Sequence, residues 1–336
     1  MSSLYIIKSS NTRVDLCGGT LDLWPISVLI ENSKTYNCSL SCMTEVSYQN
    51  GLKSLEITVE SPDFNDVFTF KDLSDFYESS DSKLSLLQES LKAFSHKAKQ
   101  EVFIGKWHLK SESPAGSGLG GSSSLLITII KVLSELTSTE LSESEMVTCA
   151  KNIETRVLNK PAGVQDYYPA IKTGLNCITF NTFGENRKIL EQEDLDFLKE
   201  HLLIVDSQIK HHSGMNNWDI FKRLIDENDN VKSALIQLSE ISNDFEDVLK
   251  KKSLTALTSL FVRELTARKK VSESYFNSEL LEFCKKLDSV NGVLAYKVCG
   301  AGGGGCLLVL HEPGQRRSVI QELRGQSIKD LPFEFI

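Results

Sequence analysis

Two hydrophobic spacings alternate along the first half of the chain. Apolar residues at every second position predict strands over residues 4–16, 27–48 and 54–61, and we expect the last two to run antiparallel. A further strand is predicted over 102–111, "VFIGKWHLKS". Apolar residues three and four positions apart predict a helix over 83–99.

Helical spacing dominates much of the second half. A helix is predicted over 142–158, a strand over 201–207, and mostly helices with polar faces over 215–287. Residues 292–310, "GVLAYKVCGAGGGGCLLVL", predict a strand, a glycine-rich turn and a second strand. Strands and helices are intermixed without strict alternation, which predicts an α+β fold.

The chain is long enough for two domains. It has 336 residues, of which 40% are hydrophobic and 24% charged, a composition typical of a globular protein with a sizeable core. The change from mixed strands to long helices places the expected boundary near residue 190. We therefore predict one domain over 1–190 and a second over 191–336.

Charge and cysteine content argue against several classes of protein. The net charge is -8 and no run of Lys and Arg stands out, so we expect no nucleic-acid partner. No stretch reaches the roughly 18 apolar residues of a membrane span, and the N-terminus lacks a signal-peptide pattern, so we expect no membrane partner. Eight cysteines without paired zinc-site spacing predict reduced thiols in a cytoplasmic protein. The sequence leaves the oligomeric state open.

A glycine- and serine-rich stretch runs directly into an apolar helix over residues 113–133, "SPAGSGLGGSSSLLITIIKVL". Glycines let backbone N–H groups converge on a ligand, and the positive end of a helix dipole follows them, so the stretch predicts a phosphate cradle. The hydroxyls of Ser122–Ser124 can cap the helix or bind a phosphate-bound Mg²⁺. The alternative is a flexible turn capped by serine. The stretch matches neither the Walker A pattern nor the dinucleotide fingerprint.

Three segments in order resemble the GHMP kinase superfamily, which includes galactokinase, homoserine kinase, mevalonate kinase and phosphomevalonate kinase. They are "NTRVDLCGGTLDLWP" (11–25), "SPAGSGLGGSSS" (113–124) and "KVCGAGGGGC" (297–306). The resemblance covers about residues 11–310. It implies a two-domain fold, with an N-terminal ATP-binding domain like ribosomal protein S5 domain 2 and a ferredoxin-like C-terminal domain. It also implies that ATP and Mg²⁺ are the cofactors, and that ATP and acceptor meet in the cleft between the domains.

Within the superfamily, the chain is most similar to bacterial sugar kinases acting on heptose 7-phosphate and to the related fucokinases. Arg13 and the following "GGTLDLWP" resemble their first motif, although Thr20 and Leu21 depart from it. The resemblance implies phosphoryl transfer to a sugar or sugar-phosphate hydroxyl, in particular the anomeric one of a heptose phosphate or of a fucose- or galactose-like sugar. Two alternatives stay open. One is a kinase of a non-sugar alcohol such as mevalonate, and the other is an inactive nucleotide-binding regulatory protein.

The resemblance also implies roles for individual residues. Asp166, in "NKPAGVQDYYPA", would orient and deprotonate the acceptor hydroxyl, and Arg13 would face it and offset negative charge. A plain turn residue and a solvated arginine are the alternatives. The residues expected to bind ATP are Pro114, Gly116, Gly118, Leu119, Gly120, Gly121, Ser122, Ser123 and Ser124.

Glu154 is expected to bind the metal ion. It follows Val147 by seven residues and Ala150 by four, so it shares a helical face with apolar neighbours and needs a partner. The matching family position is a Mg²⁺ ligand, and Ser122 would be the second protein ligand. A rim carboxylate paired with Lys or Arg is the alternative.

The acceptor is expected to contact three glycine-rich or polar segments. Asp22 would hydrogen-bond sugar hydroxyls, although such a residue also caps tight turns. The loop "KHHSGMN" (210–216) is either an acceptor contact or a plain surface loop, and the last loop is either a second glycine loop or a hairpin turn. The expected substrate-binding residues are Gly18, Gly19, Asp22, His212, Ser213, Gly302 and Gly303.

Overall fold

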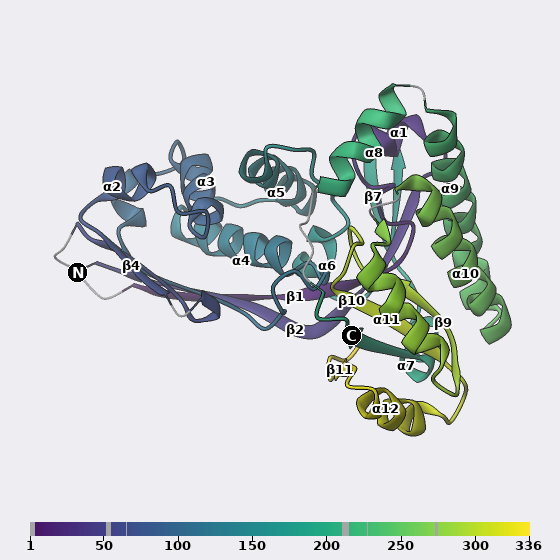
Figure 1. Ribbon diagram of the computed structural model, residues 1–336. Helices are drawn as coiled ribbons and strands as arrows, with labels where there is room; N and C mark the ends of the chain where they lie inside the picture. The colour runs from purple at the N-terminus through teal and green to yellow at the C-terminus, as the bar shows by residue number, and fades with distance from the viewer. Residues whose placement is uncertain (1–3, 52–54, 65, 210–214, 227, 273–274) are drawn as a thin grey trace. The chain divides into compact units, whose positions relative to one another are not determined.

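The computed structural model describes the whole chain except residues 1–3, 52–54, 65, 210–214, 227 and 273–274 (Figure 1). The described residues form two compact units, each assembled from three segments. The first unit comprises 1–12, 42–114 and 121–172, and the second comprises 13–41, 115–120 and 173–336. Two strands, β1 (Tyr5–Cys17) and β2 (Lys34–Asn50), contribute residues to both units. The single boundary expected near residue 190 stays a prediction.

The strands of the first unit confirm most of the alternating pattern. The second half of β2 pairs antiparallel with β5 (Gly105–Ser111). β3 (Ile57–Ser61) pairs in parallel with β5 and antiparallel with β4 (Asp66–Phe70). The strands expected over 27–48 and 54–61 therefore do run in opposite directions, but β5 lies between them. The first residues of the predicted strand 102–111 form a 3-10 helix, Gln100–Phe103, and its backbone ladder begins at Gly105.

Helices cover one face of these strands in Figure 1. The apolar helix α4 packs against α3, α5 and α6. Its residues Leu126, Ile127, Ile129 and Ile130 are all fully buried, which accounts for the uninterrupted apolar run in the sequence. The helices of this unit are α2 (Leu73–Glu78), α3 (Ser85–Phe94), α4 (Gly121–Leu136), α5 (Glu143–Leu158) and α6 (Tyr167–Ile171), with a second 3-10 turn at Pro62–Phe64.

The second unit has strands in two places. The first half of β2 pairs with β6 (Leu175–Asn181), and β6 pairs with β7 (Gly184–Ile189). A separate antiparallel sheet has the order β11-β8-β10-β9. Its strands are β8 (Leu202–Asp206), β9 (Val293–Val298), β10 (Cys306–His311) and β11 (Lys329–Leu331). The strand, glycine turn and strand expected over 292–310 are therefore confirmed as β9 and β10.

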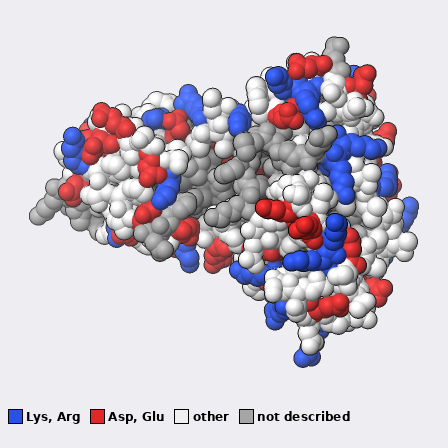
Figure 2. Space-filling view, viewed as in Figure 1, with Lys and Arg blue, Asp and Glu red and all other residues white. Residues whose placement is uncertain are grey.

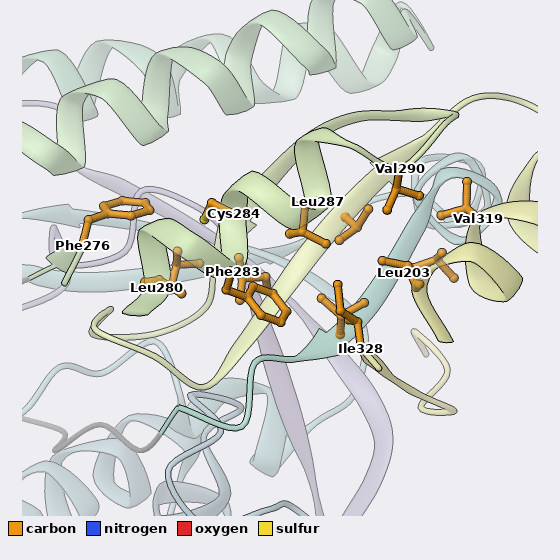
Figure 3. Close-up of a cluster of buried hydrophobic side chains, with 14 of the residues drawn as sticks. Leu203, Phe276, Leu280, Phe283, Cys284, Leu287, Val290, Val319 and Ile328 are labelled. Atoms are coloured by element: carbon orange, nitrogen blue, oxygen red, sulfur yellow. The ribbon is translucent and has the colours of Figure 1, made fainter. Parts of the chain in front are cut away.

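The helices expected over 215–287 are also confirmed. They are α8 (Met215–Ile225), α9 (Asp229–Lys250), α10 (Leu254–Val271) and α11 (Ser278–Asp288). Two more helices belong to this unit: α7 (Gln192–His201) directly precedes β8, and α12 (Arg316–Gly325) lies between β10 and β11 in the sequence. Figure 3 shows its core, in which Leu280, Phe283 and Leu287 of α11 pack with Leu203 of β8 and Val319 of α12.

One short segment contradicts the alternating pattern. Residues 27–30 were expected to begin a strand, but Ile26–Leu29 form helix α1. Ile26 and Ile30 are buried four residues apart, and the N–H groups of Val28 and Leu29 both donate to Pro25 O. A four-residue spacing suits a helical turn, and it competes with alternation in so short a window.

Charged side chains of both signs are interspersed on the face shown in Figure 2. Within the described parts of the chain, no helix combines the length and the apolar character needed to cross a membrane.

Candidate active site

The glycine-rich loop leads into a helix, as the sequence predicts. Gly116, Gly118 and Gly120 have φ angles of 71°, 73° and 71°, a backbone region that favours glycine, and α4 begins at Gly121. The first-turn N–H groups of an α-helix have no partner within the helix. The start of α4 therefore presents N–H groups of the kind that bind anions at helix N-termini.

Part of the glycine content has a different cause, which is close packing of two backbone segments. A β-carbon at Gly118 would lie 2.7 Å from Cys299 O, and one at Gly305 would lie 2.7 Å from Gly116 O. Cys306 N–H donates to Ser117 O at 2.7 Å. Residues 116–118 therefore pack directly against residues 299–306, and side chains at these positions would separate the two loops.

Arg13 anchors the same loop within the second unit. Its backbone N–H donates to Leu119 O at 3.0 Å, and its guanidinium donates to Gly118 O. The residue is 4% exposed. The solvated arginine that the sequence left open as an alternative is therefore wrong, and the catalytic role of Arg13 stays a prediction.

The three serines at the start of α4 have different environments. Ser124 is fully buried, and its hydroxyl lies within 3.0 Å of Asn11 O and 2.9 Å of Thr44 Oγ1. Ser123 is 6% exposed, and its hydroxyl donates to Glu154 Oε1 at 3.1 Å. Ser122 is exposed. Ser124 therefore ties the helix start to its own unit, Ser123 contacts Glu154, and Ser122 is accessible to solvent.

Glu154 lies on α5, whose N-terminus carries a capping box formed by Ser142 and Glu145. Its carboxylate accepts hydrogen bonds from Ser123 and from the hydroxyl of Tyr167. Carboxylate and hydroxyl oxygens are hard donors that suit Mg²⁺, which takes one or two protein carboxylates and completes its shell with phosphate and water. The oxygen atoms here fit such an ion. Among the described residues no group of three or more His, Cys, Asp and Glu could hold a metal.

Asp166 directly precedes α6, and its side chain does not cap that helix. The helix is held at both ends within the first unit. Tyr167 at its start contacts Glu154, and Ala170 O near its end accepts from Lys131 Nζ at 2.7 Å. These contacts fix the backbone that carries Asp166.

The sequence analysis did not single out Tyr167 or Lys131. Lys131 is the one charged residue in the apolar run "LLITIIKVL". A lone charge in such a run indicates a side chain that needs a polar partner. Its ammonium donates to Ser10 Oγ at 2.8 Å as well as to α6, and burial lowers its pKa to about 8. Tyr167 had no distinguishing signal, because a tyrosine after an aspartate is common in loops and cores alike.

The expected acceptor turn is compact. Gly18 has φ 78°, and its carbonyl accepts from Leu21 N–H at 3.1 Å. Asp22 is 4% exposed, whereas Trp24 two residues later is 65% exposed. The turn therefore places one buried carboxylate and one exposed indole within three residues.

Four charged side chains lie buried next to this turn in the second unit, and we call them the buried charge cluster. Lys297 Nζ lies 2.9 Å from Asp15 Oδ2 and 3.0 Å from Glu264 Oε1. The Arg268 guanidinium lies 3.2 Å from Asp15 Oδ2 and 3.1 Å from Glu264 Oε1. Each positive group therefore contacts both carboxylates, in a closed arrangement of Asp15, Glu264, Arg268 and Lys297.

Neighbouring opposite charges favour the ionised forms of Asp15 and Lys297. Burial alone would raise the pKa of Asp15, but Lys297, Arg268 and Arg13 outweigh burial and lower it. Burial and Arg268 alone would lower the pKa of Lys297, but Asp15 and Glu264 outweigh them and raise it. The sequence analysis missed this cluster. Two members lie close to residues that the sequence indicated: Asp15 follows Arg13 by two positions on the same strand face, and Lys297 is the first residue of the last glycine motif. Nothing in the sequence of α10 indicated that Glu264 and Arg268 are buried.

The remaining acceptor residues divide into two groups. His212 and Ser213 lie outside the described residues. Gly302 and Gly303 belong to the loop between β9 and β10, and both contact Tyr275. A β-carbon at Gly302 would lie 2.1 Å from the Tyr275 ring, and Gly303 N–H donates to Tyr275 O at 2.9 Å.

Two segments of the chain match models of known domains. Residues 85–174 match the GHMP kinases N terminal domain, and residues 264–329 match the GHMP kinases C terminal domain. The first match contains the glycine loop, Glu154 and Asp166. The second contains most of the buried charge cluster and the loop between β9 and β10.

Relatives support the same assignment. D-glycero-alpha-D-manno-heptose 7-phosphate kinase of Campylobacter jejuni is 26% identical over 289 residues, 83% of this chain and 82% of the relative. A galactokinase of Thermococcus kodakarensis is 25% identical over 250 residues, 66% of this chain and 68% of the relative. The solved D-glycero-D-manno-heptose 1-phosphate kinase of Bacteroides thetaiotaomicron has a TM-score of 0.77 at 20% identity, over 99% of this chain and 96% of that chain. The two GHMP kinase domain models therefore match this chain in order, and the fold of the solved heptose 1-phosphate kinase extends over nearly its whole length.

Proposed function

We propose that this protein transfers the γ-phosphoryl group of ATP to a hydroxyl group of a sugar or a sugar phosphate. The observation that carries the proposal is the set of contacts in which Ser123, at the start of α4, and Tyr167, next to Asp166, both donate to Glu154. These contacts bring together, within one unit, the start of α4, the carboxylate that would bind the metal ion and the segment that carries Asp166. The sugar class is supported by the names of the two relatives, a heptose 7-phosphate kinase and a galactokinase.

In this proposal, the loop around Gly116, Gly118 and Gly120 holds the phosphates of ATP. Its backbone and the first N–H groups of α4 would donate to phosphate oxygens, and the positive end of the helix dipole would add to their attraction. Pro114 and Leu119 would shape the loop rather than contact phosphate. Glu154 with Ser122 or Ser123 would hold Mg²⁺. When bound, this ion supplies neutralisation of the phosphate charge.

Asp166 would orient the acceptor hydroxyl and take its proton. A bond forms between the acceptor oxygen and the γ-phosphorus, the bond from that phosphorus to the β–γ bridging oxygen breaks, and ADP leaves. Arg13 would offset the negative charge that builds up during transfer.

The acceptor would bind at the turn that carries Gly18, Gly19 and Asp22 and at the loop that carries Gly302 and Gly303. A carboxylate is a natural acceptor for sugar hydroxyls, and the exposed Trp24 offers an aromatic face for the apolar side of a sugar ring. The phosphorylated position in this proposal is the anomeric hydroxyl of a heptose phosphate or of a fucose- or galactose-like sugar. A cytoplasmic location also belongs to the proposal, since eight free cysteines suit a reducing compartment.

The test is ADP release by the purified protein with Mg²⁺-ATP and a panel of acceptors. The panel contains heptose phosphates, galactose, fucose and mevalonate. We expect the highest kcat/KM with one of the sugars, and ³¹P NMR of the product should show an anomeric phosphate. Faster turnover of mevalonate than of every sugar would support a kinase of a non-sugar alcohol. ATP binding without turnover of any acceptor would support the regulatory alternative.

A further inference from the structure

The buried charge cluster contacts the turn that we assign to the acceptor. Gly18 N–H donates to Glu264 Oε1 at 3.3 Å. A β-carbon at Gly19 would lie 2.4 Å from Asp15 Oδ2 and 2.5 Å from an Arg268 nitrogen. The turn therefore rests directly on three members of the cluster, and a glycine at position 19 is required by that contact.

The same cluster reaches the second glycine loop through one aromatic ring. The Arg268 guanidinium lies 5.1 Å from the centroid of the Tyr275 ring, within range of a cation–π contact. Gly302 packs against that ring, and Tyr275 OH donates to Val298 O at 3.0 Å. Asn277 Nδ2 also donates to Gly303 O at 2.8 Å. The loop at Gly302–Gly303 is thus linked to the cluster through the contact between Arg268 and Tyr275.

Stability alone does not account for such a cluster. Its four side chains are between 0% and 3% exposed. Removing four charges from water is costly, and apolar residues of similar volume are often as stabilising or more so. Asp15 Oδ1 and Glu264 Oε2 are also buried and accept no hydrogen bond from the described residues. The cluster therefore carries a desolvation free-energy cost that an apolar core would not have.

We propose that the buried charge cluster is a positioning device that sets acceptor affinity by holding the turn at Gly18–Gly19 and the loop at Gly302–Gly303 in their binding geometry. Its members act through the backbone and through Tyr275, and they do not contact the reacting atoms. The inference rests on the proposed function, because it assigns both segments to the acceptor. It adds four residues that affect acceptor affinity without contacting the acceptor themselves.

The first experiment separates acceptor binding from ATP binding. Glu264→Gln keeps the shape of the side chain but leaves Arg268 and Lys297 opposed by Asp15 alone. With the best acceptor of the panel, we expect the acceptor KM to rise about tenfold or more while the ATP KM changes less than about twofold. Equal changes in both KM values, or no change in either, would overturn the inference.

A charge-balanced double variant provides the second test. Glu264→Gln combined with Lys297→Met removes one negative and one positive charge, so the remaining pair of Asp15 and Arg268 is neutral. We expect the acceptor KM of this variant to lie closer to wild type than that of Glu264→Gln. An acceptor KM equal to or higher than that of the single variant would contradict a role based on charge balance.

The neighbouring residue on α10 offers a matched control. Arg263 forms an exposed ion pair with Asp244 at 2.9 Å. Arg263→Met removes a charge one position from Glu264 without touching the cluster. We expect both KM values to stay within about twofold of wild type, because exposed pairs contribute little. A rise in the acceptor KM as large as that of Glu264→Gln would show that any charge change on α10 has this effect.

Hydrogen–deuterium exchange tests whether the cluster positions the turn and the loop even if no acceptor is found. In Glu264→Gln, we expect faster exchange in peptides that contain Gly18–Gly19 and Gly302–Gly303, and unchanged exchange in a peptide from α5. Unchanged exchange in the turn and the loop would overturn the positioning role. Failure of the wild-type protein to phosphorylate any sugar would instead remove the proposed function, and the exchange result would still stand by itself.

Discussion

Tyr167 donates its hydroxyl hydrogen to the carboxylate of Glu154, and the residue immediately before this tyrosine is Asp166. The orientation of the carboxylate proposed to bind the metal ion is therefore tied to the segment that carries the acid proposed to orient the acceptor. Ser123 donates to the same carboxylate from the start of α4. Groups that hold a metal ligand in place commonly affect metal affinity as strongly as they affect activity.

Removing the Tyr167 hydroxyl should weaken the metal site. We expect Tyr167→Phe to raise the Mg²⁺ concentration needed for half-maximal activity and to lower kcat, by about tenfold each. Calorimetry with Mg²⁺ and a non-hydrolysable ATP analogue measures the metal effect without turnover. Tyr77→Phe is the control, because the Tyr77 hydroxyl is buried with no hydrogen-bond partner among the described residues. Identical behaviour of the two variants would exclude a role for the Tyr167 contact.

Neutralising Asp166 should affect the chemical step and leave ATP binding intact. Asp166→Asn keeps the size of the side chain but removes its charge. We expect kcat to fall by about 10²-fold or more, with ATP affinity nearly unchanged. Single-turnover kinetics and calorimetry with ATP provide the two measurements. An Asp166→Asn protein with near-wild-type kcat would remove this residue from the mechanism.

A side chain in the phosphate loop should block the nucleotide. Gly120 has φ 71° immediately before α4, so Gly120→Val both strains the backbone and fills the space where phosphate oxygens would lie. We expect ATP binding to be lost in calorimetry. Gly314→Val is the matched control, since Gly314 has φ 72° and open space around its would-be β-carbon. Unchanged ATP affinity in a folded Gly120→Val protein would place the cradle elsewhere.

Truncation of Asp22 should affect the acceptor KM and the ATP KM differently. We expect Asp22→Ala to raise the acceptor KM by about tenfold and to leave the ATP KM within about twofold, because the lost contacts are with the acceptor. Steady-state kinetics with each substrate varied in turn gives both values. If the ATP KM rises as much as the acceptor KM, Asp22 serves the turn as a structural cap instead.

Acidification should reduce stability through His311. This side chain is fully buried in β10, and burial lowers its pKa, with Arg316 and His201 adding to the effect. Below the ordinary pKa of about 6.5 the unfolded chain binds a proton that the folded chain does not, so the free energy of unfolding falls as pH decreases. Urea denaturation at about pH 7 and about pH 5.5 measures this loss.

His311→Gln should lose less stability between these two pH values than wild type, because it lacks the group that titrates. His96→Gln, at an exposed position, should retain the wild-type loss. Equal losses in wild type and His311→Gln would show that other groups account for the acid sensitivity.

Several local features were predictable from sequence because their causes are local. The capping box of Ser142 and Glu145 depends on two side chains and the backbone between them. The glycine run before α4 and the strands on either side of the last glycine loop likewise depend on residues that are adjacent in the chain. The place of Glu154 on an inward helical face predicted that its carboxylate needs a partner, and Ser123 and Tyr167 are such partners. Its role as a Mg²⁺ ligand together with Ser122 stays a prediction.

Other features depend on which segments meet in space. The position of β5 between β2 and β3 cannot be derived from alternation, because alternation fixes which face a residue occupies and not which strand lies beside it. Helix α1 was missed because a four-residue spacing and a two-residue spacing coincide over so few positions.

The buried charge cluster shows the same distinction at the candidate site. The sequence by itself determined the family motifs, the glycine-rich loop before α4 and the candidate acids. Only the tertiary structure decided that Asp15, Glu264 and Lys297, separated by 249 and 33 positions (264 − 15 and 297 − 264), share one buried arrangement. A charged residue on a strand or a helix looks the same in sequence whether it faces water or three partners. The desolvation cost of burying such a residue is offset only when distant segments bring opposite charges within about 3 Å.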